Sequence, residues 1–136
     1  MNAVKAFVDT NLLVYLYSHT EPNISSRVID ALNKYDCVVS TQVLNEFCNV
    51  CVRKMKISPE AVKKAIIEIT AVCRVVYINE KDIFRALKVH AEYGYSCFDS
   101  LMIASALESN CQYLLSEDMA DGQVIDSIVT IKNIFK

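Results

Sequence analysis

The sequence feature that most constrains the fold is a short apolar run near the N-terminus that ends in a carboxylate. Residues 6–17 read Ala-Phe-Val-Asp-Thr-Asn-Leu-Leu-Val-Tyr-Leu-Tyr, and the acid is Asp9. The run before Asp9 is typical of a buried strand, and the apolar residues after Asn11 have helical spacing. A charge at the end of a buried strand is costly unless something binds it. Ligands of open α/β sheets bind at the carboxyl ends of the strands, so Asp9 is the first candidate functional residue.

Strands and helices alternate along the rest of the chain. We predict strands at residues 4–8, 36–40, 75–78, 113–115 and 129–131. Helices are predicted at residues 10–17, about 23–35, about 41–55, 59–71, 80–93 and 99–109. Asn23 or Ser25, Ser40 or Thr41, and Asn79 are the expected N-caps. This alternation predicts an α/β, three-layer domain with a central parallel sheet and helices on both faces. No repeat or linker interrupts residues 1–136, which we expect to form one domain.

The composition is that of a globular chain. Of the 136 residues, 53% are hydrophobic and 22% are charged, which supports a packed core. No apolar run has the length of a membrane span, and the N-terminus has no long apolar signal region. Six cysteines lie in apolar contexts, which is typical of reduced, buried thiols. They are Cys37, Cys48, Cys51, Cys73, Cys97 and Cys111. We expect a cytoplasmic protein without membrane association.

Several acids fall where this topology exposes side chains to one crevice. They are Asp9 after the first strand, Glu46 in the helix after the second, Asp99 at a helix N-terminus, and Asp118 and Asp121 after the fourth strand. Oxygen ligands of this kind suit Mg²⁺ or Mn²⁺, and such a site can activate water for phosphodiester cleavage. Each acid also has an ordinary alternative role as a helix cap, an exposed helix residue or a turn residue.

Four segments resemble the successive motifs of a known family. They are residues 7–13 (Phe-Val-Asp-Thr-Asn-Leu-Leu), 45–47 (Asn-Glu-Phe), 98–106 (Phe-Asp-Ser-Leu-Met-Ile-Ala-Ser-Ala) and 114–119 (Leu-Leu-Ser-Glu-Asp-Met). Their order and spacing resemble those of PIN-domain ribonucleases, in particular VapC-type toxins of prokaryotic toxin–antitoxin pairs. The resemblance covers nearly the whole chain, and the four segments together are far more specific than the first alone.

The resemblance implies an endoribonuclease that depends on Mg²⁺ or Mn²⁺. It carries over Asp9, Glu46 and Asp99 as the acidic metal site. It also carries over Asp118 as the fourth acid, which makes these four the candidate catalytic and metal-binding residues. Ser116 is implied as the small hydroxyl residue that holds the loop after the fourth strand.

The resemblance also implies supporting residues and partners. Asp121 assists or replaces Asp118, and Thr10 and Asn11 hydrogen-bond within the site rather than carry out chemistry. Members of the family usually form homodimers. They are held inactive by a small VapB-type antitoxin that inserts a segment into the active-site groove, so we expect RNA, an antitoxin and a second copy as partners.

Substrate binding requires positive charge near the acids, because RNA is a polyanion. The formal net charge of −2 neither supports nor excludes this. Arg53, Lys54, Lys56, Lys63 and Lys64 form the candidate basic cluster, with an ordinary solvated surface as the alternative.

Aromatic and histidine residues complete the candidates. Tyr93 and Tyr95 are candidates for stacking on bases, whereas we expect Phe98 to pack at a helix end. We expect His19 and His90 to be non-catalytic, with His90 on the apolar side of its helix, because a bound metal supplies the activated water.

Other function classes fit the sequence less well. A phosphotransfer receiver domain needs an acidic pair after the first strand, where Thr10 and Asn11 stand. A phosphatase of the haloacid dehalogenase type needs a second aspartate at position 11. A PIN nuclease of RNA processing and a PIN module that binds without cutting remain open alternatives, although the intact set of acids disfavours the second.

Overall fold

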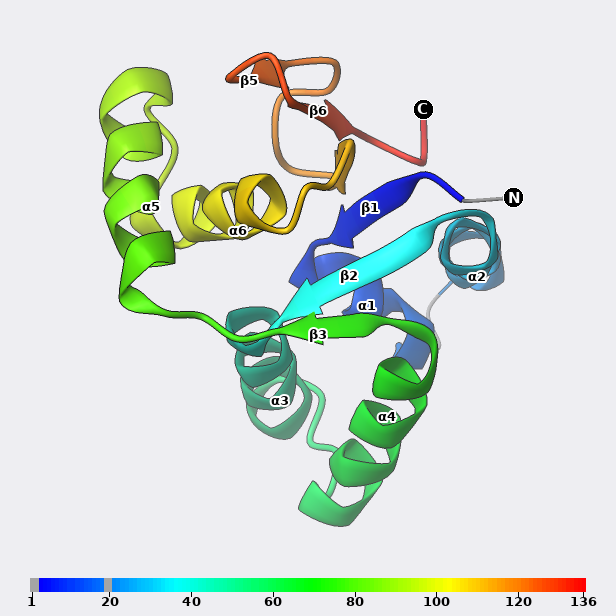
Figure 1. Ribbon diagram of the computed structural model, residues 1–136. Helices are drawn as coiled ribbons and strands as arrows, with labels where there is room; N and C mark the ends of the chain where they lie inside the picture. Colours follow the sequence, from blue (N-terminus) through cyan, green and yellow to red (C-terminus); the bar gives the residue numbers. More distant parts are fainter. Residues whose placement is uncertain (1–2, 19–20) are drawn as a thin grey trace.

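The computed structural model describes residues 3–18 and 21–136 (Figure 1). His19, one of the two histidines discussed above, lies outside these ranges. The elements in chain order are β1 (Lys5–Val8), α1 (Thr10–Tyr17), α2 (Pro22–Lys34), β2 (Asp36–Ser40), α3 (Thr41–Arg53), α4 (Pro59–Val72), β3 (Arg74–Val76), α5 (Glu80–Tyr93), α6 (Cys97–Glu108), β4 (Tyr113–Leu115), β5 (Val124–Ile125) and β6 (Val129–Lys132). The predicted α/β class is confirmed.

The strands form one mostly parallel sheet with the order β3-β2-β1-β4-β6-β5. Every neighbouring pair is parallel except β5 and β6. The chain moves outward from β1 to β3 and then returns past β1 to β4. Because crossovers between parallel strands are right-handed, this reversal places α1–α4 on one face and α5–α6 on the other. Figure 1 shows the two helical layers on opposite sides of the sheet.

The reversal creates a switch point between β1 and β4. The helices that follow β1 lie on one face of the sheet, and the helices that lead to β4 lie on the other. In open α/β sheets, ligands bind at the carboxyl ends of the strands at such a point. The strand residues here are apolar and buried on both faces, as Phe7, Val8, Leu114 and Leu115 illustrate with exposures of at most 1%. The polar residues that follow these strands are therefore held at a rigid, dry edge of the sheet.

Helix α6 is the central helix of its layer. Its apolar residues surround the helix instead of forming one stripe, and Met102, Ile103 and Leu107 are all buried. It packs between α5 and the strands β2, β4 and β6, which accounts for burial on all sides. The first turn of α6 is consequently fixed relative to the sheet.

Most of the predicted helix signals are confirmed. The side chain of Ser40 accepts a hydrogen bond from the backbone N–H of Val43 and caps α3. Asn79 and Asp82 form a capping box at the start of α5, and Gly94 ends that helix with a φ of 78°. Glycine is favoured at this left-handed position because it has no Cβ that would clash with the backbone.

Some boundary predictions are wrong. Helix α2 begins at Pro22, with Glu21 at the cap position and no side-chain cap bond, whereas we expected Asn23 or Ser25. Proline at the first helical position explains the earlier start, since its missing N–H has no helical partner there. Helix α6 begins at Cys97 rather than Asp99, because Ser96 is the cap.

Two further expectations fail at the C-terminal half. The hairpin strand β5 was missed because it has only two residues, and the hairpin turns through Asp126 and Ser127 with positive φ angles. On α5, the helical spacing of Ile83, Ala86 and Leu87 predicts an apolar face toward the core, but Ile83 and Leu87 are 47% and 55% exposed. Within residues 3–18 and 21–136, none of the helices is both long and apolar enough to cross a bilayer.

Candidate active site

Asp9 lies at the switch point, immediately after β1, and is only 5% exposed. It occupies the N-cap position of α1 but makes no side-chain capping bond. Its Oδ2 instead accepts a hydrogen bond of 2.8 Å from the hydroxyl of Ser116, the first residue after β4. The Ser116 hydroxyl also accepts the backbone N–H of Met119 at 3.4 Å. The bond from Ser116 to Asp9 joins the ends of the neighbouring strands β4 and β1 and orients the Asp9 carboxylate.

Glu46 reaches the same edge from the second turn of α3. Its Oε2 accepts a hydrogen bond of 2.9 Å from the hydroxyl of Thr10, the residue after Asp9. Thr10 is 5% exposed, so this contact is largely shielded from water. Glu46 therefore sits beside the Asp9 segment and not on a solvated helix face, and Thr10 hydrogen-bonds to a candidate acid as expected.

Gln42 is a residue that the sequence reasoning missed. Its Nε2 donates to Glu46 Oε1 at 3.2 Å and to the backbone carbonyl of Phe98 at 3.1 Å. It thus connects α3 to the first turn of α6, at the residue before Asp99. Its Oε1 is buried without a hydrogen-bond partner among the described residues. The four-residue spacing between Gln42 and Glu46 on one helix was the available signal.

Asp118 lies in the loop after β4 and is exposed. Its Oδ2 accepts a hydrogen bond of 2.7 Å from the side chain of Asn11, in the first turn of α1. Asp121 is engaged elsewhere, because its Oδ1 accepts the backbone N–H of Asn133 at 2.8 Å. Of the two loop acids, only Asp118 is linked to the Asp9 segment within the described chain.

Asp99 lies in the first turn of α6 and is half-buried. Ser96 caps the helix by accepting the backbone N–H of Asp99 at 3.1 Å. The carboxylate of Asp99 is therefore not needed as the cap. It lies close enough to Asp9 for its charge to influence the pKa of Asp9.

The electrostatics of these acids are unfavourable in the protein alone. Burial raises the pKa of Asp9 from 3.8 to about 6, the Ser116 hydrogen bond opposes this, and the charges of Asp99 and Asp118 add to it. Burial also raises the pKa of Asp99, with a further contribution from Asp118. In the described parts of the chain, none of these acids or Glu46 forms a salt bridge. The negative charge is therefore uncompensated.

A divalent cation fits this donor set chemically. Carboxylate oxygens are hard ligands, and a cation would offset the burial and the charge repulsion that together raise the pKa of Asp9. Over residues 3–18 and 21–136, no three histidine, cysteine, aspartate or glutamate side chains are grouped closely enough to hold an ion together. Mg²⁺ does not require such a cage, because it usually binds one or two carboxylates and keeps several waters.

The aromatic residues near Asp99 are arranged differently from the expectation. Phe98 was expected to pack at the helix end, but its side chain is 70% exposed. The hydroxyl of Tyr95 donates to Gln123 Oε1 at 2.5 Å, and that of Tyr93 donates to Asp126 at 3.0 Å. His90, expected on an apolar face, is exposed. Phe98 is therefore the aromatic side chain free to meet a ligand beside Asp99.

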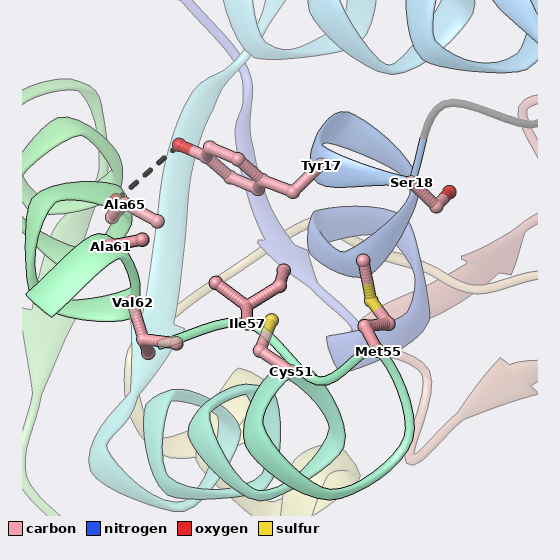
Figure 2. Close-up of a pocket in the computed structure, with 8 residues that line it drawn as sticks. All are labelled: Tyr17, Ser18, Cys51, Met55, Ile57, Ala61, Val62 and Ala65. Atoms are coloured by element: carbon pink, nitrogen blue, oxygen red, sulfur yellow. Dashed lines mark hydrogen bonds between the residues drawn. The ribbon is translucent and has the colours of Figure 1, made fainter. Parts of the chain in front are cut away.

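A separate apolar pocket of about 510 Å³ lies between the end of α1, the end of α3 and the start of α4 (Figure 2). Figure 2 shows Tyr17 spanning its upper side toward Ala65, with Cys51, Met55 and Ile57 below. The Tyr17 hydroxyl donates to Glu68 at 2.8 Å. The described residues that line this pocket include no carboxylate, so it is distinct from the acidic site.

Fold and site together are typical of α/β nucleases. The sequence matches the model of the PIN domain over residues 6–120. The chain therefore belongs to the PIN-domain family, a family of nucleases that typically use divalent metals. The predicted family resemblance is confirmed. No curated protein sequence gives a significant match.

Solved structures with similar folds include toxins and complexes of toxin–antitoxin pairs. A toxin–antitoxin complex from Klebsiella pneumoniae has a TM-score of 0.71 at 16% identity, covering 95% of this chain and 97% of that chain. VapBC2 from Rickettsia felis, bound to a promoter DNA fragment, has a TM-score of 0.68 at 16% identity, covering 96% and 100%. VapC20 of Mycobacterium tuberculosis, described as a sarcin-ricin loop cleaving toxin, has a TM-score of 0.65 at 19% identity, covering 80% of this chain and 86% of that chain. At these identities the likeness concerns the fold.

Proposed function

We propose that this PIN domain is a divalent-metal-dependent endoribonuclease and the toxin of a toxin–antitoxin pair. The observation that carries the proposal is the buried Asp9 at the switch point, with Asp99 and Asp118 close enough to raise its pKa and no basic partner in the described chain. An uncompensated buried charge is costly in a folded protein, and such strain is most often retained at functional sites.

In this proposal the metal would bind among Asp9, Glu46, Asp99 and Asp118, directly to one or two of these carboxylates and through retained waters to the others. A bound Mg²⁺ or Mn²⁺ lowers the pKa of water and stabilises charge on a phosphodiester. Ser116 orients the Asp9 carboxylate through its hydrogen bond of 2.8 Å. Gln42 holds Glu46 and the first turn of α6, where Asp99 lies, at a fixed separation. These contacts keep the acids in place so that binding a metal needs little rearrangement.

RNA binding in this proposal uses exposed side chains around the acids. Phe98 is next to Asp99 and 70% exposed, which suits stacking on an unpaired base. The basic cluster of Arg53, Lys54, Lys56, Lys63 and Lys64 is also exposed and supplies positive charge for phosphates. Single-stranded RNA offers both a base face and an accessible backbone.

The toxin assignment is supported by the toxin–antitoxin complexes among the similar folds. A small antitoxin of the VapB type is the expected partner in the cytoplasm, and it inserts a segment beside the acids. The apolar pocket of Figure 2 gives such a partner a second point of contact. A homodimer would cover the exposed apolar side chains of α5, namely Ile83, Phe84 and Leu87, which are 47%, 67% and 55% exposed. Exposed apolar clusters of this kind are common at interfaces.

The test is cleavage of total RNA by the purified chain, freed of any co-purified partner. Reactions contain Mg²⁺, Mn²⁺ or EDTA, and they compare the wild type with Asp9→Asn, Asp99→Asn and the control Asp30→Asn. Asp30 is exposed on α2, so its variant keeps full activity. We expect cleavage that requires the metal and disappears in the two site variants.

Cleavage that persists in EDTA or in Asp99→Asn would refute the proposed mechanism. Metal binding without cleavage of any RNA would favour a PIN module that binds without cutting. Sequencing the new RNA ends distinguishes a toxin with one target from a PIN nuclease of RNA processing.

A further inference from the structure

A second group of reactive side chains lies at the opposite edge of the sheet from the acids. Cys37 is near the start of β2, Cys73 directly precedes β3, and Cys111 precedes β4 by two residues. Their exposures are 1%, 5% and 1%, and all three are free thiols. Figure 1 shows the start of β2 and the connection from α4 to β3 at this edge.

The strand register places Cys37 and Cys73 side by side. In the parallel pairing of β2 and β3, Val38 is opposite Arg74, so the preceding residues are Cys37 and Cys73. Neighbouring strands lie about 4.8 Å apart, and residues in register point to the same face. That spacing is within the range of roughly 4.4–6.8 Å between the Cα atoms of a disulfide.

The two thiols already interact. Each thiol shifts the pKa of the other: that of Cys37 is raised and that of Cys73 is lowered, so Cys73 is the more easily ionised partner. The Cys37 thiol itself donates to the backbone carbonyl of Ala31 at 3.9 Å. A thiolate is the nucleophile in thiol oxidation, so Cys73 is the thiol that reacts first. Cys111 interacts with the Ser109 hydroxyl at 3.4 Å instead.

Small molecules have a route to Cys73, one of the two thiols. Cys73 lines a cavity of about 290 Å³ between α1, α2 and α4, with Leu13, Leu16 and Tyr17 among its other walls. Tyr17 also lines the pocket of Figure 2, so the two hollows are neighbours. The cavity has room for several water-sized molecules, and a peroxide is little larger.

We propose that Cys37 and Cys73 form a peroxide-sensitive dithiol that oxidises to an intramolecular disulfide between β2 and the end of α4. Hydrogen peroxide is the oxidant. The Cys73 thiolate attacks one peroxide oxygen, the O–O bond breaks, and hydroxide leaves, which gives a sulfenic acid. Cys37 then attacks that sulfur, the S–S bond forms, the S–O bond breaks, and water leaves with the Cys37 proton.

In total, two thiols lose two electrons and two protons, and one hydrogen peroxide becomes two waters. Intracellular disulfides of this kind are usually transient and redox-sensing. The proposal does not depend on the nuclease assignment, because neither cysteine lies in the acidic site.

The test is disulfide mapping of the full chain after mild treatment with hydrogen peroxide. Remaining thiols are alkylated under denaturing conditions, and the protein is digested with trypsin. Cys73 falls in the peptide 65–74, and Cys37 falls in the peptide 35–53 together with Cys48 and Cys51. We expect these two peptides to be linked, with fragmentation placing the bond on Cys37. The bond should raise the melting temperature, and a thiol reductant should reverse the shift.

Variants separate this pair from the other thiols. Cys97→Ser removes the exposed thiol and with it any disulfide that Cys97 forms between molecules. This variant should keep the disulfide between Cys37 and Cys73. Cys48→Ser, on half-buried Cys48, is the matched control and should also keep it, whereas Cys73→Ser should abolish it. Recovery of alkylated Cys37 and Cys73 from the wild type, under conditions that oxidise Cys97, overturns the proposal. A bond from Cys73 to Cys111 or Cys51 overturns it as well.

Discussion

Replacing Asp9 with asparagine removes a charge that the metal-free fold has to keep in a buried position. Asp9 is 5% exposed, and its pKa is raised from 3.8 to about 6. Asparagine has nearly the same shape and still accepts the hydrogen bond from Ser116. The variant should therefore be more stable than the wild type at neutral pH in the absence of metal, although it loses the candidate active site.

The magnitude follows from the shift in pKa. An acid whose pKa is higher in the folded state binds its proton more tightly there, so the folded state is disfavoured when the acid is ionised. The shift from 3.8 to about 6 corresponds to roughly 3 kcal/mol of destabilisation above pH 6, at about 1.4 kcal/mol per pH unit. This cost decreases as the pH falls through 6 and is absent below 3.8.

The assay is urea unfolding of the wild type, Asp9→Asn and the control Asp30→Asn at several pH values in EDTA. We expect a gain of up to about 3 kcal/mol in Asp9→Asn at pH 7 that shrinks toward pH 4. The Asp30 carboxylate is exposed, so the control should follow the wild type. Saturating Mg²⁺ or Mn²⁺ should stabilise only proteins with an intact site. It should therefore reduce the difference in unfolding free energy between Asp9→Asn and the wild type.

Equal or lower stability of Asp9→Asn at pH 7 without metal would refute the reasoning that the site carries an uncompensated buried charge. A gain that does not change with pH would refute it too, because the effect would then come from packing.

Three further predictions concern the supporting residues. Gln42→Leu removes the two hydrogen bonds to Glu46 and Phe98 and should lower kcat about 10-fold or more, with little change in KM, by analogy with residues that support ligands. Ser116→Ala removes a bond that lowers the pKa of Asp9, so the acidic limb of the pH–rate profile should move to higher pH. Phe98→Ala should raise KM for single-stranded RNA roughly 10-fold, the effect of losing one stacked base, without lowering the free energy of unfolding.

Each of these has a contrary outcome. A Gln42→Leu variant with unchanged kcat would show that Glu46 needs no support, and Gln42→Glu serves as the variant that keeps the shape. If the pH–rate profile of Ser116→Ala does not move, the group that titrates in the acidic limb is not Asp9. Loss of stability in Phe98→Ala would mean that its ring is packed in solution.

The acids of the candidate site could be selected from the sequence, and the reason is local. Asp9 follows an apolar strand, and Asp118 follows another, so each is placed at the sheet edge by its own segment. Glu46 lies in the second turn of α3 and Asp99 in the first turn of α6, and both helices begin at the same edge. Parallel topology brings such positions together.

The supporting contacts required the tertiary structure. Gln42 contacts Phe98 from 56 positions away, and the sequence carries no signal for that pairing. Phe98 was assigned to packing from its apolar side chain, yet α6 turns it outward. Ile83 and Leu87 have helical spacing, but the residues that α5 buries are Asp82, Ala86 and Val89, which leaves Ile83 and Leu87 in solvent.

The sequence by itself determined the alternation of strands and helices, the parallel sheet and the set of candidate acids, because these depend on periodicity and on residues next to strand ends. Only the tertiary structure decided which side chains meet. The burial that raises the pKa of Asp9 and the register that sets Cys37 beside Cys73 both arise between segments distant in the chain. Such contacts depend on how the strands are ordered and packed, and local pattern does not encode that arrangement.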